Sequence, residues 1–320
     1  MTASLLEPPL IARLRRHERI LIAGAGGGFD VFSGLPLYFG LRAAGKKVTL
    51  ANLSFSKVPM LWERQVTPFL AEVREDSDNG NNYFPEKHLS AWFARRGEQV
   101  PVYCFHLVGP QRLAEGYRAL VQRHEIDTII LADGGTDSLM RGDEEGLGTP
   151  VEDMSSIAAV DQIDVPRKML VCLGFGIDTF HGVCHAHVLE AIAELSRAGG
   201  YLGAFSLTAD MPEVKQFVEA TEYVLAETAE RPSIVLTSIL SALEGQFGNH
   251  HRTRRTTGSE LFINPLMSMY WCFRLERVAR RIQYLDGMRD LVSYDQVSNV
   301  IESHHYGQMK GWRKWRALPM

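Results

Sequence analysis

The sequence predicts an α/β fold with a doubly wound, mostly parallel sheet of about seven strands. Short apolar runs rich in valine, isoleucine and leucine alternate with longer amphipathic segments along most of the 320 residues. Polar or glycine-rich segments follow these runs directly, as they do where a buried strand leaves a sheet. We therefore expect one α/β domain over residues 1–320, with a sheet covered by helices on both faces.

The composition excludes several classes of protein. With 45% hydrophobic and 22% charged residues, the chain resembles an ordinary globular domain. A net charge of -4 gives no electrostatic basis for nucleic-acid binding, and no run approaches the roughly 18 apolar residues of a membrane helix. The four cysteines are scattered without a CxxC pair, which is typical of a reducing compartment. We expect a cytoplasmic homo-oligomer that binds a small anionic molecule and neither nucleic acid nor membrane.

The N-terminal part has the pattern of a β-loop-α-β unit. A helix over 5–16 is expected to lead into a first strand at Arg19–Ala23. The glycine-rich loop Gly24–Asp30 follows, then a helix over 33–44 and a second strand at Lys47–Asn52. This order is the start of a parallel sheet.

Residues 55–100 interrupt the alternation. A polar, asparagine-rich loop over 72–82 precedes a helix predicted at Pro85–Arg96. Long insertions of this kind either cover a site as a lid or elaborate the surface. Both interpretations stay open.

The alternation then resumes as far as about residue 240. Further strands are predicted at Val102–Val108, Asp127–Ala132, Lys168–Leu173, Tyr201–Leu207 and Ser233–Ser238. Between them, helices are expected over 110–124, 149–162, 183–198 and 210–229, the second starting at a capping box, Thr149–Glu152. A C-terminal helical extension, 260–320, is expected to contain a long amphipathic helix over 265–286.

The polar segments fall at one edge of the predicted sheet. In open parallel α/β sheets, ligands bind beyond the carboxyl ends of the strands. The first, fourth and fifth predicted strands each end in a segment rich in glycine and chemically active side chains. Those segments are Gly24–Asp30, Asp133–Glu145 and Gly174–His181. This one-sided distribution predicts a polar site there.

The first of these segments favours an anion. Consecutive glycines expose backbone N–H groups close to a helix N-terminus. Its predicted ligand-binding residues are Gly24, Gly26, Gly27, Gly28 and Asp30. A GxGxxG fingerprint would need glycine at Phe29 and an acidic residue near Asn52, so a nicotinamide or flavin cofactor is not expected. The alternative is a tight turn without a ligand.

The second segment, LADGGTDSLMRGDEE, concentrates carboxylates. Asp133, Asp137 and Asp143 are predicted to bind a divalent cation (Mg²⁺, Mn²⁺ or Zn²⁺), because hard cations take oxygen ligands. Gly134, Gly135 and Ser138 are predicted ligand-binding residues, since Asp133–Ser138 resembles the SGGxDS loop of ATP pyrophosphatases. Asp133 replaces the phosphate-binding serine of that loop. Carboxylates that merely cap turns and helices are the alternative.

The third segment supplies candidate acid–base residues. Asp178, His181 and His185, with Asp137, are the predicted catalytic residues. If the HGVCHAH stretch is helical, His181 and His185 share a face with the spacing of zinc sites. A general base oriented by a neighbouring aspartate is an equal alternative.

Further along the chain, Arg252, Arg254 and Arg255 are predicted to hold a phosphate or carboxylate of the substrate. A solvated loop or a subunit contact explains the same residues. The basic tail with Trp312 and Trp315 is expected to pack against the protein itself.

Taken together, the motifs resemble a known family. The combination of Gly24–Asp30, Asp133–Leu139 and Arg141–Glu144 is similar to the family of domain of unknown function 1152, over roughly residues 18–290. The resemblance implies a Rossmann-like α/β domain and carries no established activity with it.

Three functions are therefore expected, in this order. The first is a hydrolase or transferase acting on a small anionic or phosphorylated metabolite, assisted by a divalent cation. The second is an ATP-dependent enzyme with a pyrophosphatase-like loop. The third is a nucleotide-binding module without catalysis.

Overall fold

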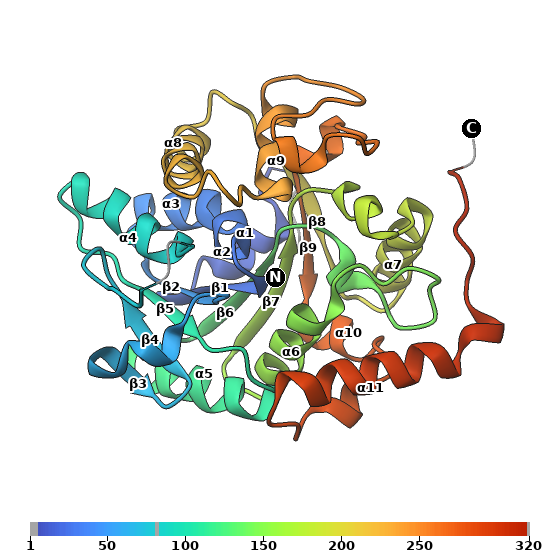
Figure 1. Ribbon diagram of the computed structural model, residues 1–320, viewed down its shortest axis with the longest axis horizontal. Helices are drawn as coiled ribbons and strands as arrows, with labels where there is room; N and C mark the ends of the chain where they lie inside the picture. The colour runs from blue at the N-terminus through green and yellow to red at the C-terminus, as the bar shows by residue number, and fades with distance from the viewer. Residues whose placement is uncertain (1–5, 81–82, 319–320) are drawn as a thin grey trace.

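The computed structural model describes residues 6–80 and 83–318. The described residues form one nine-stranded sheet in the order β3-β4-β5-β2-β1-β6-β7-β9-β8, with helices on both faces (Figure 1). The strands are β1 (Arg19–Gly27), β2 (Lys47–Leu53), β3 (Gln65–Thr67), β4 (Leu70–Val73), β5 (Val102–Phe105), β6 (Thr128–Asp133), β7 (Arg167–Cys172), β8 (Tyr201–Ser206) and β9 (Met269–Arg274).

The centre of the sheet is parallel and its two ends are not. Strands β5, β2, β1, β6 and β7 pair in parallel, whereas β4 pairs antiparallel with β5 and with β3. At the other end, β9 runs antiparallel between β7 and β8. The parallel centre brings the carboxyl ends of β1, β6 and β7 to one edge, as the sequence predicts.

Two helical layers cover the sheet, because successive residues of its buried strands point to opposite faces. One layer packs on Ile20, Ile22 and their equivalents, and consists of α1 (Pro9–Leu14), α2 (Asp30–Ser33), α3 (Leu35–Ala43), α4 (Pro85–Arg95), α8 (Pro212–Glu227) and α9 (Ile234–Leu243). The other packs on Leu21, Ala23 and their equivalents, and consists of α5 (Pro110–His124), α6 (Pro150–Asp161), α7 (His185–Arg197), α10 (Leu275–Ala279) and α11 (Tyr294–Gly307).

The expected number of strands is wrong, since nine form instead of about seven. The strand predicted at Ser233–Ser238 is the start of helix α9. Its apolar run is too short to distinguish the two periodicities, and the Ser233 side chain caps the helix by accepting a hydrogen bond from the Leu236 amide.

The prediction of one long helix over residues 265–286 is also wrong. Its first half forms strand β9, and only the short helix α10 follows directly. The sequence Met-Tyr-Trp-Cys-Phe-Arg is rich in aromatic residues that favour strands, and Tyr270 and Cys272 are fully buried. The C-terminal extension therefore contributes a strand to the sheet as well as helices.

The insertion over 55–100 contributes to the same sheet. Strands β3 and β4 extend its edge beyond β5, and α4 packs between this edge and α8. The helix predicted at Pro85–Arg96 is confirmed within one residue. Residues 81–82 of the predicted polar loop lie outside the described residues. A role as a lid stays a prediction.

None of the helices in the described part of the chain is both long and apolar enough to cross a membrane.

The C-terminal tail is anchored on the acidic loop after β6. The Arg313 side chain donates hydrogen bonds to Asp143, to the fully buried Glu144 and to Glu190. Its backbone exchanges further hydrogen bonds with Asp143 and Glu145. The Trp312 ring stacks on His305, with ring centroids 4.2 Å apart. The tail therefore packs on the protein, whereas the Trp315 ring is more than half exposed.

Replacing Arg313 is expected to destabilise the fold. Arg313→Ala leaves the Glu144 carboxylate buried without its cation, and breaking a buried ion pair in this way costs about 3 kcal/mol. Urea denaturation followed by circular dichroism measures the free energy of unfolding. Lys314→Ala is the matched control, because the Lys314–Glu145 pair is exposed and screened by solvent, so its loss should hardly change the free energy of unfolding. Equal losses for the two variants would contradict this account of the anchor.

Candidate functional site

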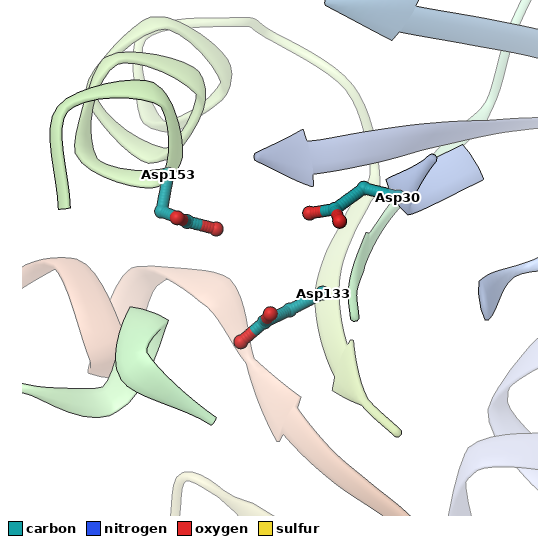
Figure 2. A group of neighbouring side chains, drawn as sticks. All are labelled: Asp30, Asp133 and Asp153. Carbon is teal, nitrogen blue, oxygen red and sulfur yellow. The ribbon is translucent and has the colours of Figure 1, made fainter. Parts of the chain in front are cut away.

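Three aspartates converge beyond the carboxyl ends of β1 and β6. Asp30 begins α2 after a two-residue turn that follows β1, Asp133 is the last residue of β6, and Asp153 lies in the first turn of α6. Each offers a carboxylate oxygen, and these oxygens all lie within 4.8 Å of one another. Figure 2 shows the three side chains pointing into a common space from three separate elements. We call Asp30, Asp133 and Asp153 the carboxylate triad.

Two members of the triad are buried, the third, Asp30, is half-buried, and their hydrogen bonding is incomplete. Asp133 and Asp153 are only 2% and 4% exposed. Asp133 accepts a hydrogen bond from the Ser138 hydroxyl, and Asp30 accepts one of 2.7 Å from the Gly26 amide. The Oδ1 atom of Asp153 has no hydrogen-bond partner within the described part of the chain. A buried carboxylate oxygen without a hydrogen-bond partner is energetically costly, so the ionised form of Asp153 is unfavourable beside two other carboxylates.

Two further buried aspartates lie beside the triad and have structural partners. Asp137 accepts hydrogen bonds from the backbone and hydroxyl of Thr149, which joins the loop after β6 to the start of α6. Asp178 accepts hydrogen bonds from the backbone and hydroxyl of Thr136. Both predicted catalytic aspartates therefore hold the loops around the triad in place.

The electrostatic state of this region follows from its burial. Burial raises the pKa of Asp133 and of Asp153, and the neighbouring Asp137 raises both further. Burial raises the pKa of Asp30 to about 8, against hydrogen bonds from Gly26 and Gly134. None of the ion pairs in residues 6–80 and 83–318 involves the triad, Asp137 or Asp178. These carboxylates must therefore take up protons or a cation.

The glycines of both loops make room for these carboxylates. A Cβ atom at Gly26 would lie 2.6 Å from Asp30 Oδ2, and one at Gly135 would lie 2.6 Å from both Asp178 oxygens. At Gly134 it would approach Asp30 and Ser33 to 2.9 Å. Glycine is therefore needed here for close packing, and side chains of the protein itself occupy the space.

The predicted phosphate-binding amides are largely engaged. Strand β1 extends through Gly27, so most of the glycine-rich loop belongs to the sheet. The Gly28 amide donates to the Leu53 carbonyl and the Thr136 amide to Asp178. A Cβ atom at Gly24 would clash with Asn52 Oδ1, and one at Gly27 would clash with the Phe55 ring, so these side chains lie directly over the two glycines. Anion binding by this loop stays a prediction.

The two candidate histidines lie on separate elements. His181 ends a 3-10 helix, Ile177–His181, and Gly182 with a φ of 86° separates it from α7, which begins at His185. The helical spacing that would make them zinc ligands is therefore absent. His181 is exposed, and its charge opposes the rise that burial causes in the Asp137 pKa. His185 packs against Phe175 and Phe262, and burial lowers its pKa.

Asp143 does not join the triad. Its carboxylate is paired with the guanidinium groups of Arg141 and Arg313, which lower its pKa despite partial burial. The structure thus brings only Asp133, of the three residues predicted to bind a metal, into the triad.

The three candidate arginines line a cleft of about 580 Å³ between α8 and the loop after α9. Arg252 is paired with Glu222 and Glu244, and Arg255 donates to the Pro232 carbonyl. Arg254 forms no ion pair with any other described residue. An adjoining cleft of about 920 Å³ is lined by Tyr83, Lys87 and Arg231, among others. No member of the triad lines either cleft, and Tyr83 of the adjoining cleft is close enough to Asp30 and Arg255 for both to affect its pKa.

The sequence interpretation missed Asp153. It assigned Thr149 and Glu152 to a capping box, but the Thr149 side chain does not cap α6, and Glu152 accepts a hydrogen bond from the Tyr294 hydroxyl. The available signal was an acidic residue in a helix that is otherwise small and apolar, DMSSIAAV. Asn52 and Glu86, which are fully buried, were missed as well.

Comparison with known families agrees with the suspected resemblance. A family model described as "Protein of unknown function (DUF1152)" matches residues 21–306. The chain belongs to this family. The matched DUF1152 region contains every strand except the first two residues of β1, all three residues of the triad, and α11 almost to its end. The anchored tail with Arg313 lies beyond it. No curated protein and no solved structure gives a significant match.

Proposed function

We propose that this protein is a divalent-cation-dependent enzyme that hydrolyses, or transfers a group from, a small anionic or phosphorylated metabolite. The observation that carries the proposal is the carboxylate triad, in which the buried Oδ1 of Asp153 has no partner among the described residues. A hard cation such as Mg²⁺ or Mn²⁺ takes oxygen ligands and would satisfy all three side chains. It would also neutralise the repulsion between them.

The place of the triad in the sheet supports an active site. From β1 the chain first builds β2 and β5 on one side and then β6 and β7 on the other, so the strand order reverses between β1 and β6. The parallel strands thereby follow the order 3-2-1-4-5 of dinucleotide-binding sheets, which supports a Rossmann-like fold. Ligands of such sheets bind outside the carboxyl ends at the point of reversal. Asp30 and Asp133 lie at that point.

The cation would recruit the anionic substrate. Four buried aspartates and the half-buried Asp30 would repel an anion on their own, whereas a bound cation would supply Lewis-acid chemistry to a phosphoryl or carboxyl oxygen and to water. The exposed His181, close to Asp137, is the side chain we assign to proton transfer. The arginine cleft would hold a second negative group of the substrate, with Arg254 as its available guanidinium.

The pyrophosphatase alternative receives less support. In that pattern the backbone amides of the loop bind phosphate, but here Asp178 already accepts a hydrogen bond from the Thr136 amide. A non-catalytic nucleotide-binding module differs from the proposal in turnover alone.

The proposal is tested by cation binding and turnover together. Chelator-treated protein is titrated with Mn²⁺ by calorimetry, and a panel of phosphorylated metabolites is then assayed for phosphate release with and without Mn²⁺. We expect stoichiometric Mn²⁺ binding and Mn²⁺-dependent turnover of at least one compound. Absence of Mn²⁺ binding at millimolar concentration overturns the proposal. Binding of Mn²⁺ and nucleotide without any turnover supports the non-catalytic module instead.

For a substrate found in this way, Arg254→Ala is expected to raise KM about tenfold with little change in kcat, because a charge-assisted hydrogen bond contributes roughly 1.5 kcal/mol to binding. Arg231→Ala, in the adjoining cleft, is the matched control, and its KM should stay near the wild-type value. A larger effect at Arg231 than at Arg254 would move the predicted anion site to the adjoining cleft.

A further inference from the structure

Glu86 is a buried carboxylate that the triad does not include. It lies in the first turn of α4, within the insertion, and its side chain is fully buried. Its Oε1 atom accepts a hydrogen bond of 2.8 Å from Asn52 Nδ2, and burial raises the pKa of the carboxyl to about 7 although Asn52 and the Ser54 hydroxyl favour its charged form. Burial of a carboxylate without an ion pair is unfavourable. Its place in the fold therefore requires a reason.

The partner of Glu86 is the side chain that shapes the turn after β1. Asn52, at the end of β2, donates its second N–H of Nδ2 to the Gly28 carbonyl at 2.6 Å. Its Oδ1 atom accepts a hydrogen bond of 3.3 Å from the Val31 amide. These two backbone groups stand on either side of Asp30 in the chain. Asn52 thus clamps the turn that presents one member of the triad.

Glu86 fixes the orientation of this clamp. Its Oε1 atom is an acceptor for Asn52 Nδ2, and this contact places the amide nitrogen of Asn52, and not its oxygen, toward α4. With the amide reversed, Asn52 Oδ1 would face the Glu86 carboxylate and the Gly28 carbonyl, and the Val31 amide would lose its acceptor. A Cβ atom at Gly24 would lie 2.2 Å from Asn52 Oδ1, so the clamp fits closely against β1.

We infer that Glu86 is a positioning residue for the cation site. Through Asn52 it holds the Gly28–Val31 turn and thereby sets the position of Asp30 relative to Asp133 and Asp153. This inference rests on the proposed cation site and assigns the insertion a role in it. Residues that orient the ligands of a metal typically change its affinity roughly 10- to 100-fold when replaced.

The test measures Mn²⁺ affinity of three Glu86 variants by calorimetry. Glu86→Leu removes the acceptor and is expected to weaken Mn²⁺ binding about tenfold or more. Glu86→Asp keeps the charge but shortens the side chain by one methylene, so it should lose the contact with Asn52 and weaken binding similarly. Glu86→Gln still offers an oxygen to Asn52 and should stay within about threefold of the wild type. Retention by Gln but not by Asp separates positioning from charge.

Ser90→Ala is the matched control. Ser90 lies one turn further along α4, is equally buried, and donates its hydroxyl to the Val100 carbonyl, away from the triad. Its Mn²⁺ affinity should equal that of the wild type. Unchanged affinity in folded Glu86→Leu and Glu86→Asp, or an equal loss in Ser90→Ala, overturns the inference. If Glu86→Leu does not fold, the Asp and Gln variants still decide the question. Failure of the wild type itself to bind Mn²⁺ would instead overturn the proposed function.

Discussion

Asp153→Asn is expected to abolish Mn²⁺ binding and to raise the melting temperature of the cation-free protein. The substitution keeps the shape of the side chain but removes one of three negative charges around the cation. A unit charge at about 4 Å contributes roughly 4 kcal/mol at the effective dielectric constant of such sites, so the affinity should fall at least a hundredfold. The neutral amide in place of the carboxylate also relieves repulsion within the triad, and the cation-free fold becomes more stable.

The opposite signs of the two effects make the result diagnostic. Replacing a carboxylate with a purely structural role would destabilise the protein. Replacing a carboxylate that binds a cation, and that lowers the stability of the cation-free fold, would not. Calorimetry gives the affinity and differential scanning calorimetry gives the melting temperature. Ser155→Ala, a buried hydroxyl on the same helix that bonds the Val151 carbonyl, should leave the affinity unchanged. Wild-type affinity in Asp153→Asn, or a marked loss of stability, would remove Asp153 from the site.

Added Mn²⁺ is expected to stabilise the protein much more at pH 8 than at pH 6. The pKa of Asp30 is raised from its ordinary value of 3.8 to about 8, mainly by burial. Between these values the folded state holds a proton that the unfolded state has released. The contribution of Asp30 to stability is therefore fully present below pH 3.8 and is lost as the pH rises through about 8. The cation-free protein should thus melt at progressively lower temperature over this range.

The cation reverses this trend because it competes with protons for the same oxygens. Below the Asp30 pKa, deprotonation of Asp30 should raise the apparent affinity for Mn²⁺ by about tenfold for each unit by which the pH increases. Thermal melting with and without Mn²⁺ at several pH values between 6 and 8 measures both effects. In Asp30→Asn the increase of the Mn²⁺ effect with pH should be much smaller. A Mn²⁺ effect that is independent of pH in the wild type would show that the cation binds elsewhere.

Some parts of the site could be predicted from the sequence because they follow from local pattern. Asp133 ends one apolar strand and Asp30 closely follows another, and parallel strands of one sheet end at one edge. The glycines beside them were predicted to bind a ligand, which stays a prediction, and in the structure they allow close packing around carboxylates. Asp143 shows the limit of this reasoning: its neighbours in sequence resemble ligands, but Arg313, 170 residues away, engages it.

The errors in the predicted fold have a similar origin. Short apolar runs such as Ser233–Ser238 fit a strand and a helix equally, and their neighbours in space decide between the two. Strand β9 forms because β7 and β8 leave a place between them that an aromatic segment can fill. Nothing local to Met269–Arg274 identifies that place, since its partners are far away in the chain.

Local residue patterns were sufficient to predict the fold class, the edge of the sheet where the triad lies, and the excess of carboxylates there. Each of these depends on periodicity and order along the chain, which such patterns express directly. Which carboxylates meet depends instead on tertiary packing. Asp153 reaches Asp30 and Asp133 because α6 packs across β1, and Glu86 reaches Asn52 because α4 packs on the same sheet from the insertion. Contacts of this kind depend on how whole elements pack, and no single stretch of sequence encodes them.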